Sequence, residues 1–409
     1  MDTKRKLKHL IKHFGFKKEE LSEIQKMYDG EFFNPQDPAV LKLYEFSKQV
    51  CDEYNQILFD AKQKTNLFKT IKNMFKKTRL MNKMFPGHGL FGDIRQLDCV
   101  IGLVDLKNYV FLNKHTVFSR YALVTMEPRT MFGVRVTVGT DDVEKKGKLI
   151  KLGKIVIGKD CWLGAGAVVE NGTTIEDGAV VAGGAYLNTD APKNSLMLGR
   201  PAKVFAIVDE NYKSKPKEKP VYTEEQKRNI YAVLKELGYK SVIKDYNKIL
   251  NGERFNTAKP KLGGLFMLTH RLCAELNAPE TTDKRKEQIK HWLFPNCGKN
   301  LTIGENFLID ILGVAVVGNN VAIGNNVCLA GNLFIGNNVT IKDYAVVFGS
   351  EHDLYVKKRN NPILRATWLD VMKINDNVTI EENAIIAPSS TVDKNVTKNA
   401  LYTNKKIII

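Results

Sequence analysis

The sequence predicts a mainly β fold with additional α-helices, in which two tandem parallel β-helices are each preceded by a helical module. Two observations carry this prediction: the second half of the chain repeats motifs of the first, and each half places apolar residues at intervals of six. The length of 409 residues suits two modules, because domains commonly have about 100 to 200 residues. A content of 43% hydrophobic and 26% charged residues excludes a disordered chain.

The repeat is clearest in a short segment that occurs twice. Residues 30–34 are Gly-Glu-Phe-Phe-Asn and residues 252–256 are Gly-Glu-Arg-Phe-Asn, a shift of 222. The same shift relates Pro38 to Pro260, Leu43 to Leu265, Cys51 to Cys273, Glu53 to Glu275 and Asn55 to Asn277. Residues 10–17 recur with one residue of slip at 233–240, so we expect a duplication that begins near the first residue.

We therefore expect five segments. They are the helical module of copy one at 1–85, the first β-helix at 86–208, a linker at 209–222, the helical module of copy two at 223–296 and the second β-helix at 297–409. The linker contains the Lys- and Pro-rich stretch 213–220, which is too polar to pack. In the first module, residues spaced three and four apart follow the turn from Pro35 to Pro38 and predict a helix through Tyr54 and Asn55.

The six-residue interval fits neither an α-helix nor an alternating strand. In copy one it gives Ile94, Val100, Leu106, Leu112, Phe118 and Val124, and after a gap Ile157, Leu163, Val169, Ile175, Val181 and Leu187. In copy two it gives Val317, Ile323, Leu329, Ile335, Ile341 and Val347, and then Ile374, Ile380, Ile386 and Val392. Short strands joined by tight corners explain it, with one aliphatic side chain pointing inward per face and Gly or Asn at positive φ. Ordinary hairpins would require the spacing to be coincidental.

Hexads of this type, interrupted once by a polar loop, resemble the hexapeptide-repeat acyltransferases, whose left-handed β-helices assemble as trimers. Residues 27–38, with the helix through Asn55, are similar to the N-terminal module of the maltose, galactoside and nodulation-factor O-acetyltransferases, and copy two carries a weaker version. The resemblance implies a CoA-dependent sugar O- or N-acetyltransferase. In that family acetyl-CoA lies in a groove between neighbouring β-helices, and a histidine at the start of the interrupting loop is the general base.

His352 is the residue that the resemblance marks as this base. The hexad at 335–339 runs without a gap to residues 349–352, Gly-Ser-Glu-His, which is the family's spacing from coil to histidine. A neutral imidazole suits the chemistry, because a sugar hydroxyl is a poor nucleophile until its proton is removed. In copy one, a shift of 223 puts Arg129 opposite His352, and no histidine follows as far as Asp141. The alternative reading is that His352 is an ordinary solvated loop residue.

Asp310 is the second predicted catalytic residue. The family has an active-site Asn shortly after a Gly-x-Asn-Phe motif, and here residues 304–307, Gly-Glu-Asn-Phe, lead to Asp310. About two extra hexads separate it from His352 compared with the family, which leaves open that Asp310 lies one coil too far away.

The resemblance places the CoA-binding residues in copy one. Residues 157–166 and the ending Gly-Arg-Pro-Ala-Lys at 199–203 resemble the family's Trp-Ile-Gly coil and its Gly-Asn-Pro-Ala-Lys ending. The predicted contacts are Trp162, Gly164, Ala182, Gly183, Arg200 and Lys203. Small residues would let the pantetheine arm approach the backbone, and the two cations would meet phosphates. Copy two has Thr-Ile-Glu at 379–381 and lacks this ending, and Trp162 has simple packing as its alternative reading.

Three functional hypotheses therefore stand. The first is the acetyltransferase, a soluble cytoplasmic homotrimer that uses acetyl-CoA and a sugar or nucleotide sugar, without metal, membrane or nucleic acid. The second is a non-catalytic acyl-CoA-binding or assembly protein made from two worn enzyme halves. The third, nucleic-acid binding, rests on the net charge of +17 alone and lacks a recognisable module. Because each copy keeps motifs that the other has lost, a site composed of both copies is a further possibility.

Overall fold

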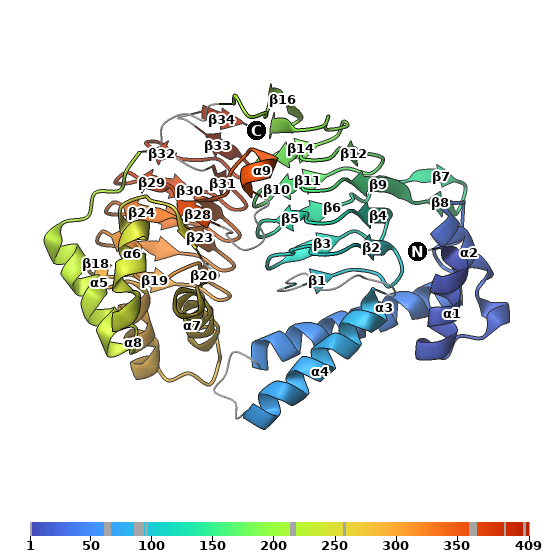
Figure 1. Ribbon diagram of the computed structural model, residues 1–409, viewed down its shortest axis with the longest axis horizontal. Helices are drawn as coiled ribbons and strands as arrows, with labels where there is room; N and C mark the ends of the chain where they lie inside the picture. Colours follow the sequence, from blue (N-terminus) through green and yellow to red (C-terminus); the bar gives the residue numbers. More distant parts are fainter. Residues whose placement is uncertain are drawn as a thin grey trace. The chain divides into compact units, whose positions relative to one another are not determined.

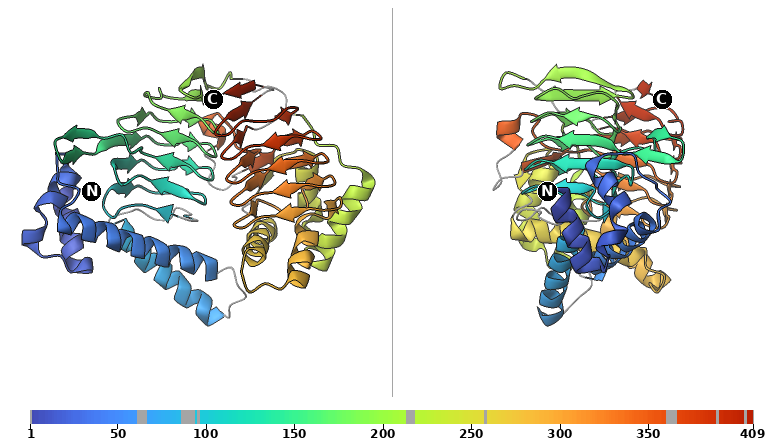
Figure 2. Two further views of the ribbon diagram at one scale, coloured as in Figure 1. Left: turned by 180° about the vertical axis from the view of Figure 1, so that it is seen from behind. Right: turned by 90° about the vertical axis from the view of Figure 1, so that its right-hand side faces the viewer.

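The computed structural model describes residues 2–60, 67–85, 94, 97–212, 218–256, 259–359, 366–387, 390–403 and 406–408 (Figures 1 and 2). The chain forms two compact units, Met1–Glu210 and Asn211–Ile409, here called unit 1 and unit 2. Each unit begins with helices and continues as a stack of short parallel strands, which is the mainly β architecture with α-helices that the sequence predicts.

Unit 1 starts with helices and winds three parallel sheets above them. Its helices are α1 (Thr3–Phe14), η1 (Lys18–Glu20), α2 (Ser22–Asp29), α3 (Pro38–Asp60) and α4 (Leu67–Met84). Its strands are β1 (Leu97–Asp98), β2 (Val104–Leu106), β3 (Thr116–Phe118), β4 (Ala122–Met126), β5 (Met131–Phe132), β6 (Thr137–Val138), β7 (Glu144–Lys146), β8 (Leu149–Lys151), β9 (Gly153–Ile157), β10 (Trp162–Leu163), β11 (Val168–Val169), β12 (Thr174–Ile175), β13 (Val180–Val181), β14 (Tyr186–Leu187), β15 (Ser195–Gly199) and β16 (Ala202–Ile207). The sheets have the orders β1-β3-β6-β11-β14, β2-β4-β9-β12 and β5-β10-β13-β15-β16. Successive strands of one sheet therefore belong to successive coils of a β-helix.

Unit 2 repeats this plan. Its helices are α5 (Glu224–Glu236), η2 (Lys240–Val242), α6 (Ile243–Leu250), α7 (Pro260–Leu276), α8 (Asp283–Leu293) and α9 (Val356–Arg359). Its strands are β17 (Phe255–Asn256), β18 (Asn296–Cys297), β19 (Thr302–Ile303), β20 (Leu308–Ile309), β21 (Ala315–Val317), β22 (Ala322–Ile323), β23 (Cys328–Ala330), β24 (Asn332–Ile335), β25 (Thr340–Ile341), β26 (Val346–Phe348), β27 (Ser350–Glu351), β28 (Ala366–Leu369), β29 (Val371–Ile374), β30 (Thr379–Ile380), β31 (Ile385–Ile386), β32 (Thr391–Val392), β33 (Leu401–Thr403) and β34 (Lys406–Ile408). The coil sheets are β18-β21-β24-β29-β32, β19-β22-β25-β30 and β20-β23-β26-β31-β33-β34.

The interior of each β-helix is lined by the residues at the six-residue interval. All the hexad positions predicted from the sequence are buried, from Ile94 to Leu187 in unit 1 and from Val317 to Val392 in unit 2. Unit 1 contains two further inward positions, Phe132 and Val138, which the sequence reading missed. Strand β4 is five residues long and buries both Val124 and Met126, so the interval continues two residues out of phase. The coils before the loop therefore continue to Val138, and the loop begins after this residue and not after Val124.

Hydrogen bonds between the helices and the first coil recur in both units, and they show which residues of the two first coils correspond. The Tyr28 hydroxyl donates to the carbonyl of Ile101 at 2.8 Å, and the Tyr246 hydroxyl donates to that of Leu312. Asn55 exchanges two hydrogen bonds with the backbone of Leu97, and Asn277 does the same with Phe307. The first coils therefore correspond at shifts of 210 and 211, and the predicted coil alignment at 223 is wrong.

The corners of unit 2 are joined from coil to coil by an asparagine ladder. Its members, all at positive φ, are Asn300, Asn320, Asn338 and Asn377. Each amide nitrogen donates to the carboxamide oxygen of the next member, at distances of 2.8, 3.0 and 3.0 Å. Asparagine suits these corners because it tolerates the left-handed region better than other side-chain-bearing residues and can bond along the stack.

Both β-helices end where the chain reverses direction. In unit 1, β16 runs antiparallel to β15 with a register shift between Leu196 and Met197, and in unit 2 β34 runs antiparallel to β33. In the part of the chain that the structure describes, no helix has the length and apolar content to cross a bilayer.

Candidate active site

The loop that carries His352 leaves the β-helix of unit 2 through a narrow neck. The amide of Gly349 donates to the carbonyl of Ala330 at 2.8 Å, and the amide of Asp370 donates to that of Gly349 at 2.7 Å. Strands β27 and β28 continue the neck as an antiparallel pair. His352 follows β27 directly and is partly buried, so its backbone is held within three residues of the rigid coil.

Two arginines fix the segment around His352. Arg254, which precedes β17, forms an ion pair with Asp353. The buried Arg359 donates from Nη1 to the carbonyls of Asp353 and Leu354, at 3.3 and 2.7 Å. Strand β17 also pairs with β28 of the loop. The helical module of unit 2 therefore holds the loop on the side where His352 lies.

Asn332 supports the neck from below and was missed by the sequence reading. It is fully buried, its amide nitrogen donates to Leu369 and Ile249 carbonyls at 2.8 and 3.2 Å, and its oxygen lies 2.9 Å from the Tyr222 hydroxyl. Its backbone amide donates to the carbonyl of Asp370. The sequence does carry a signal for Asn332: a polar residue stands where the coil pattern predicts a buried side chain, and a buried polar side chain needs hydrogen-bond partners.

Asp310 and His352 lie at different levels of the same sheet. Asp310 follows β20, and the loop follows β26, with β23 between them, which is about 10 Å at the usual strand spacing. The structure instead brings Asp310 to His270 of α7, with Oδ1 and Nε2 3.5 Å apart and both side chains largely buried.

The loop of unit 1 occupies the equivalent topological position but carries different residues. It leaves after β6, forms the β7–β8 hairpin and returns at β9, and residues 139–152 contain no histidine. The predicted opposition of Arg129 to His352 is wrong, because Arg129 lies at a corner between β4 and β5. There it forms two hydrogen bonds with Asp160 at 2.5 and 2.8 Å. Asp141 lies in the loop itself.

The predicted CoA-binding residues of unit 1 share one sheet and its edge. Trp162 pairs with Met131 and Val180 and is partly exposed, whereas its neighbour Leu163 points inward. At the next corner, a Cβ on Gly164 would lie 2.4 Å from the nitrogen of Gly183 and 2.8 Å from the carbonyl carbon of Ala182. The coils can stack this closely only without a side chain at position 164.

Two cations lie at the far end of this sheet. Arg200 donates from Nη1 to the Gly184 carbonyl at 3.3 Å, and Lys203 is exposed on β16 opposite Leu198. Together with the glycine corner and Trp162, they give unit 1 one face with small residues in the middle and positive charge at the end. Such a face suits an extended ligand with a phosphorylated end.

Comparisons with known proteins agree with this architecture. Residues 26–89 match the maltose acetyltransferase hexapeptide capping motif, and residues 154–189 match the hexapeptide repeat of succinyl-transferase. Nodulation protein L of Rhizobium meliloti (strain 1021) is 30% identical over 189 residues, which cover 45% of this chain and 97% of that protein. Nodulation protein L of Rhizobium leguminosarum bv. viciae is 31% identical over 192 residues, 45% of this chain and 95% of that protein.

Among solved structures, a maltose O-acetyltransferase from Clostridium difficile 630 is similar, with a TM-score of 0.40 and 19% identity over 46% of this chain and 98% of that one. The nodulation protein L matches, which span almost the whole of each relative, settle the relationship together with the two motifs. The chain belongs to the hexapeptide-repeat acyltransferase family, in the branch that carries the maltose acetyltransferase capping motif.

Proposed function

We propose that this protein transfers an acetyl group from acetyl-CoA to a hydroxyl or amino group of a sugar or nucleotide sugar, with His352 as general base. The observation that carries the proposal is the position of His352, directly beyond the loop neck of unit 2. The imidazole takes the proton of the acceptor as its oxygen or nitrogen attacks the thioester carbonyl. The CoA sulfur then leaves as the thiolate and takes up a proton, so the products are the acetylated sugar and free CoA.

The donor side of the proposal draws on unit 1. The small residues Gly164, Ala182 and Gly183 would let the pantetheine arm approach the backbone, with Trp162 as a wall. Arg200 and Lys203 would contact the phosphates of CoA as charge-assisted partners. Family resemblance also favours a homotrimer. Asp310, which lies beside His270, would act in the same unit as His352 as a group that orients the acceptor.

The test is release of free CoA thiol from acetyl-CoA in the presence of a panel of sugars and amino sugars. Loss of a general base costs about 100-fold to 10,000-fold in rate, and we expect His352→Ala to fall in this range. Asp142→Ala, a change of an exposed residue in the loop of unit 1, is the matched control and should leave the rate unchanged. If His352→Ala released thiol as fast as the wild type, the assignment of the base would be wrong.

A second candidate function is non-catalytic binding of acyl-CoA or assembly. It is favoured by the division of motifs, since the histidine lies in unit 2 while Trp162 and the Gly-Arg-Pro-Ala-Lys ending lie in unit 1. Tight acetyl-CoA binding without turnover on any sugar would support it. One CoA per chain is the stoichiometry expected from the division of motifs, and two per chain would contradict it.

A further inference from the structure

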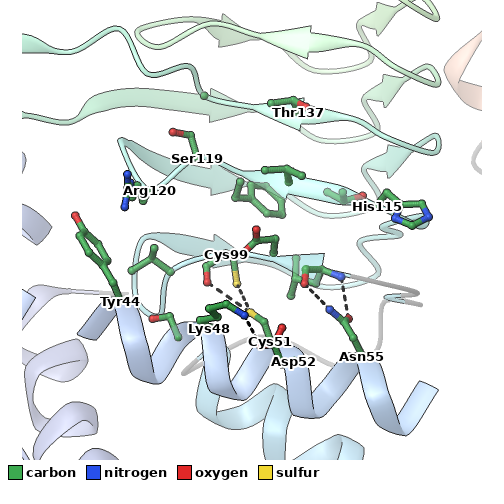
Figure 3. Close-up of a pocket in the computed structure, with 18 of the residues that line it drawn as sticks. Tyr44, Lys48, Cys51, Asp52, Asn55, Cys99, His115, Ser119, Arg120 and Thr137 are labelled. Atoms are coloured by element: carbon green, nitrogen blue, oxygen red, sulfur yellow. Dashed lines mark hydrogen bonds and ion pairs between the residues drawn. The ribbon is translucent and has the colours of Figure 1, made fainter. Parts of the chain in front are cut away.

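Unit 1 contains a pocket of about 790 Å³ that none of the roles above uses (Figure 3). Helix α3 forms one wall with Tyr44, Lys48 and Asp52, and strands β1, β3 and β6 of one sheet form the other. The loop at 139–152 leaves the coil beside it, because Gly139 and Asp141 both line the pocket. The volume lies in the usual range for small-molecule sites, about 300 to 1,000 Å³.

Two hydroxyl groups at this end of the pocket are buried without a hydrogen-bond partner. They are the hydroxyl of Tyr44 and that of Thr140, which stands between the lining residues Gly139 and Asp141. Buried hydroxyls are nearly always hydrogen-bonded, so both positions call for a partner that the chain itself does not supply. Burial raises the pKa of Tyr44 to about 12, so this hydroxyl remains a donor at neutral pH. The guanidinium carbon of Arg120 lies 5.7 Å from the centre of the Tyr44 ring.

The charges that line the pocket select the kind of ligand. The carboxylates of Glu45, Asp52, Asp98 and Asp141 line it together with the cations of Lys48 and Arg120. Lys48 is already paired with Asp52 at 2.6 Å. Carboxylates accept hydrogen bonds from hydroxyl and ammonium groups and repel anions. The pocket therefore suits a molecule with several hydroxyl or amino groups and no negative charge.

Unit 2 differs at the corresponding positions. At the shift of 222 that relates the two central helices, Tyr44 corresponds to Phe266 and Asp52 to Ala274. Phe266 stacks on Phe255 with ring centres 6.1 Å apart. The polar groups that define the pocket are therefore particular to unit 1.

We propose that this pocket binds one unit of a neutral or amino saccharide without acetylating it. The choice of a saccharide rests on the proposed function. The absence of turnover rests on the loop, which supplies no histidine at residues 139–152. His115, which also lines the pocket, comes from the corner before β3 and lies at the other end from Ser119 and Arg120 (Figure 3). A saccharide hydroxyl would accept from Tyr44, another would pair with Thr140, and the carboxylates would receive the remaining donors. Unit 1 would then hold one part of a glycan while His352 acts on another acceptor group.

The experiment measures binding of maltose, glucosamine and glucuronate to the full chain by titration calorimetry. We expect maltose or glucosamine to bind at least tenfold more tightly than glucuronate. Tyr44→Phe and Thr140→Val remove only unpartnered hydroxyls, so they should leave the melting temperature unchanged or higher while raising the Kd of the bound sugar about fivefold. Tyr109→Phe, an exposed tyrosine of the same unit outside the pocket, is the matched control and should bind as the wild type does.

The outcomes separate this inference from the proposed function. If no sugar is acetylated but sugar binding still depends on Tyr44 and Thr140, the pocket stands and the proposed acceptor chemistry falls. If sugars are acetylated and both variants bind them with unchanged Kd, the pocket proposal is overturned and the enzyme assignment stands. Preferential binding of glucuronate would also overturn the proposal, because the carboxylate-rich lining should exclude it.

Discussion

The two units build the same coil, and a corner of each shows a different way of holding successive coils together. In unit 2 the corners are bonded by side chains, as in the ladder from Asn300 to Asn377. In unit 1 the corner at Gly164 packs backbone against backbone, with no side chain between it and Gly183. A side-chain ladder adds hydrogen bonds between coils, whereas a bare corner lets the backbones of successive coils come into direct contact. The difference is one between single corners and not between whole units, because Gly318 and Gly336 of unit 2 also pack backbone against backbone and Asp177 of unit 1 bonds the amide of Lys159 in the neighbouring coil.

The largest expected effect comes from filling the bare corner. Gly164→Ala places a Cβ 2.4 Å from a backbone nitrogen of the next coil, so the coils must separate, and we expect a loss of about 3 kcal/mol in unfolding free energy. Gly183→Ala is the matched change, because its Cβ would lie 3.3 Å from the Ala165 carbonyl oxygen, and it should cost below about 1 kcal/mol. Chemical denaturation measures both. Equal losses would show that close coil contact does not constrain position 164.

The next effect tests the ladder of unit 2. Asn338→Ala removes its bonds to Asn320 and Asn377 and places alanine at a φ of 54°, so we expect a loss of about 2 kcal/mol. Asn338→Gly keeps the positive φ without strain and should lose about 1 kcal/mol. Thermal denaturation of the two variants separates the loss of the side-chain hydrogen bonds, which both share, from the backbone strain at positive φ, which only the alanine variant has. If neither variant were less stable than the wild type, the ladder would not contribute to stability.

A smaller effect, on activity, tests the positioning of His352. Arg254→Ala removes the ion pair with Asp353, so the loop loses one of its anchors and we expect turnover to fall about tenfold. Phe32→Ala is the control in unit 1, at the equivalent position of the repeated segment, and should leave turnover unchanged. We would measure kcat, KM and the melting temperature of the Arg254→Ala variant. A fall in kcat with an unchanged melting temperature indicates lost positioning of the loop and not unfolding. A fall in melting temperature as large as that of Gly164→Ala would contradict a local role for Arg254.

The smallest effect concerns pH and the first helix of unit 1. Burial lowers the pKa of His9 below its ordinary value of 6.5, and burial also lowers that of the neighbouring His13. The unfolded chain therefore binds these protons more readily, so unit 1 should lose stability as the pH falls through about 6.5. The fall in melting temperature between pH 7.5 and 5.5 should be smaller in His9→Gln. An identical fall in this variant would rule out a contribution from His9.

The fold could be predicted closely from the sequence because burial in a β-helix is periodic and local. Each inward residue, such as Ile157 or Ile341, is determined by its own hexad. The prediction failed where one strand broke the interval, at Val124 and Met126, and this error led to the wrong alignment of Arg129 with His352.

The candidate site was less accessible to the sequence reading. The resemblance to the family marks His352 as the general base, and this role stays a proposal. The contacts around it join residues that are distant in the chain, such as Arg254 with Asp353 and Tyr222 with Asn332. Asp310 lies beside His270 because α7 packs against β20, and no local pattern indicates this pairing. The pocket of unit 1 could not be predicted from the sequence either, because its walls, α3 and a sheet, come from separate parts of the chain.

The reversed strands at the ends of the coils have a consequence for solubility. A stack of parallel strands exposes unpaired amides and carbonyls at its last coil, where another stack could add and grow into a fibre. In each unit the chain covers this edge in one of the three coil sheets with an antiparallel strand, β16 or β34, and in unit 1 a register shift at Met197 further breaks the regular spacing. An incoming parallel coil meets an edge of the wrong direction. Each β-helix is therefore protected against end-to-end polymerisation along one of its three sheets.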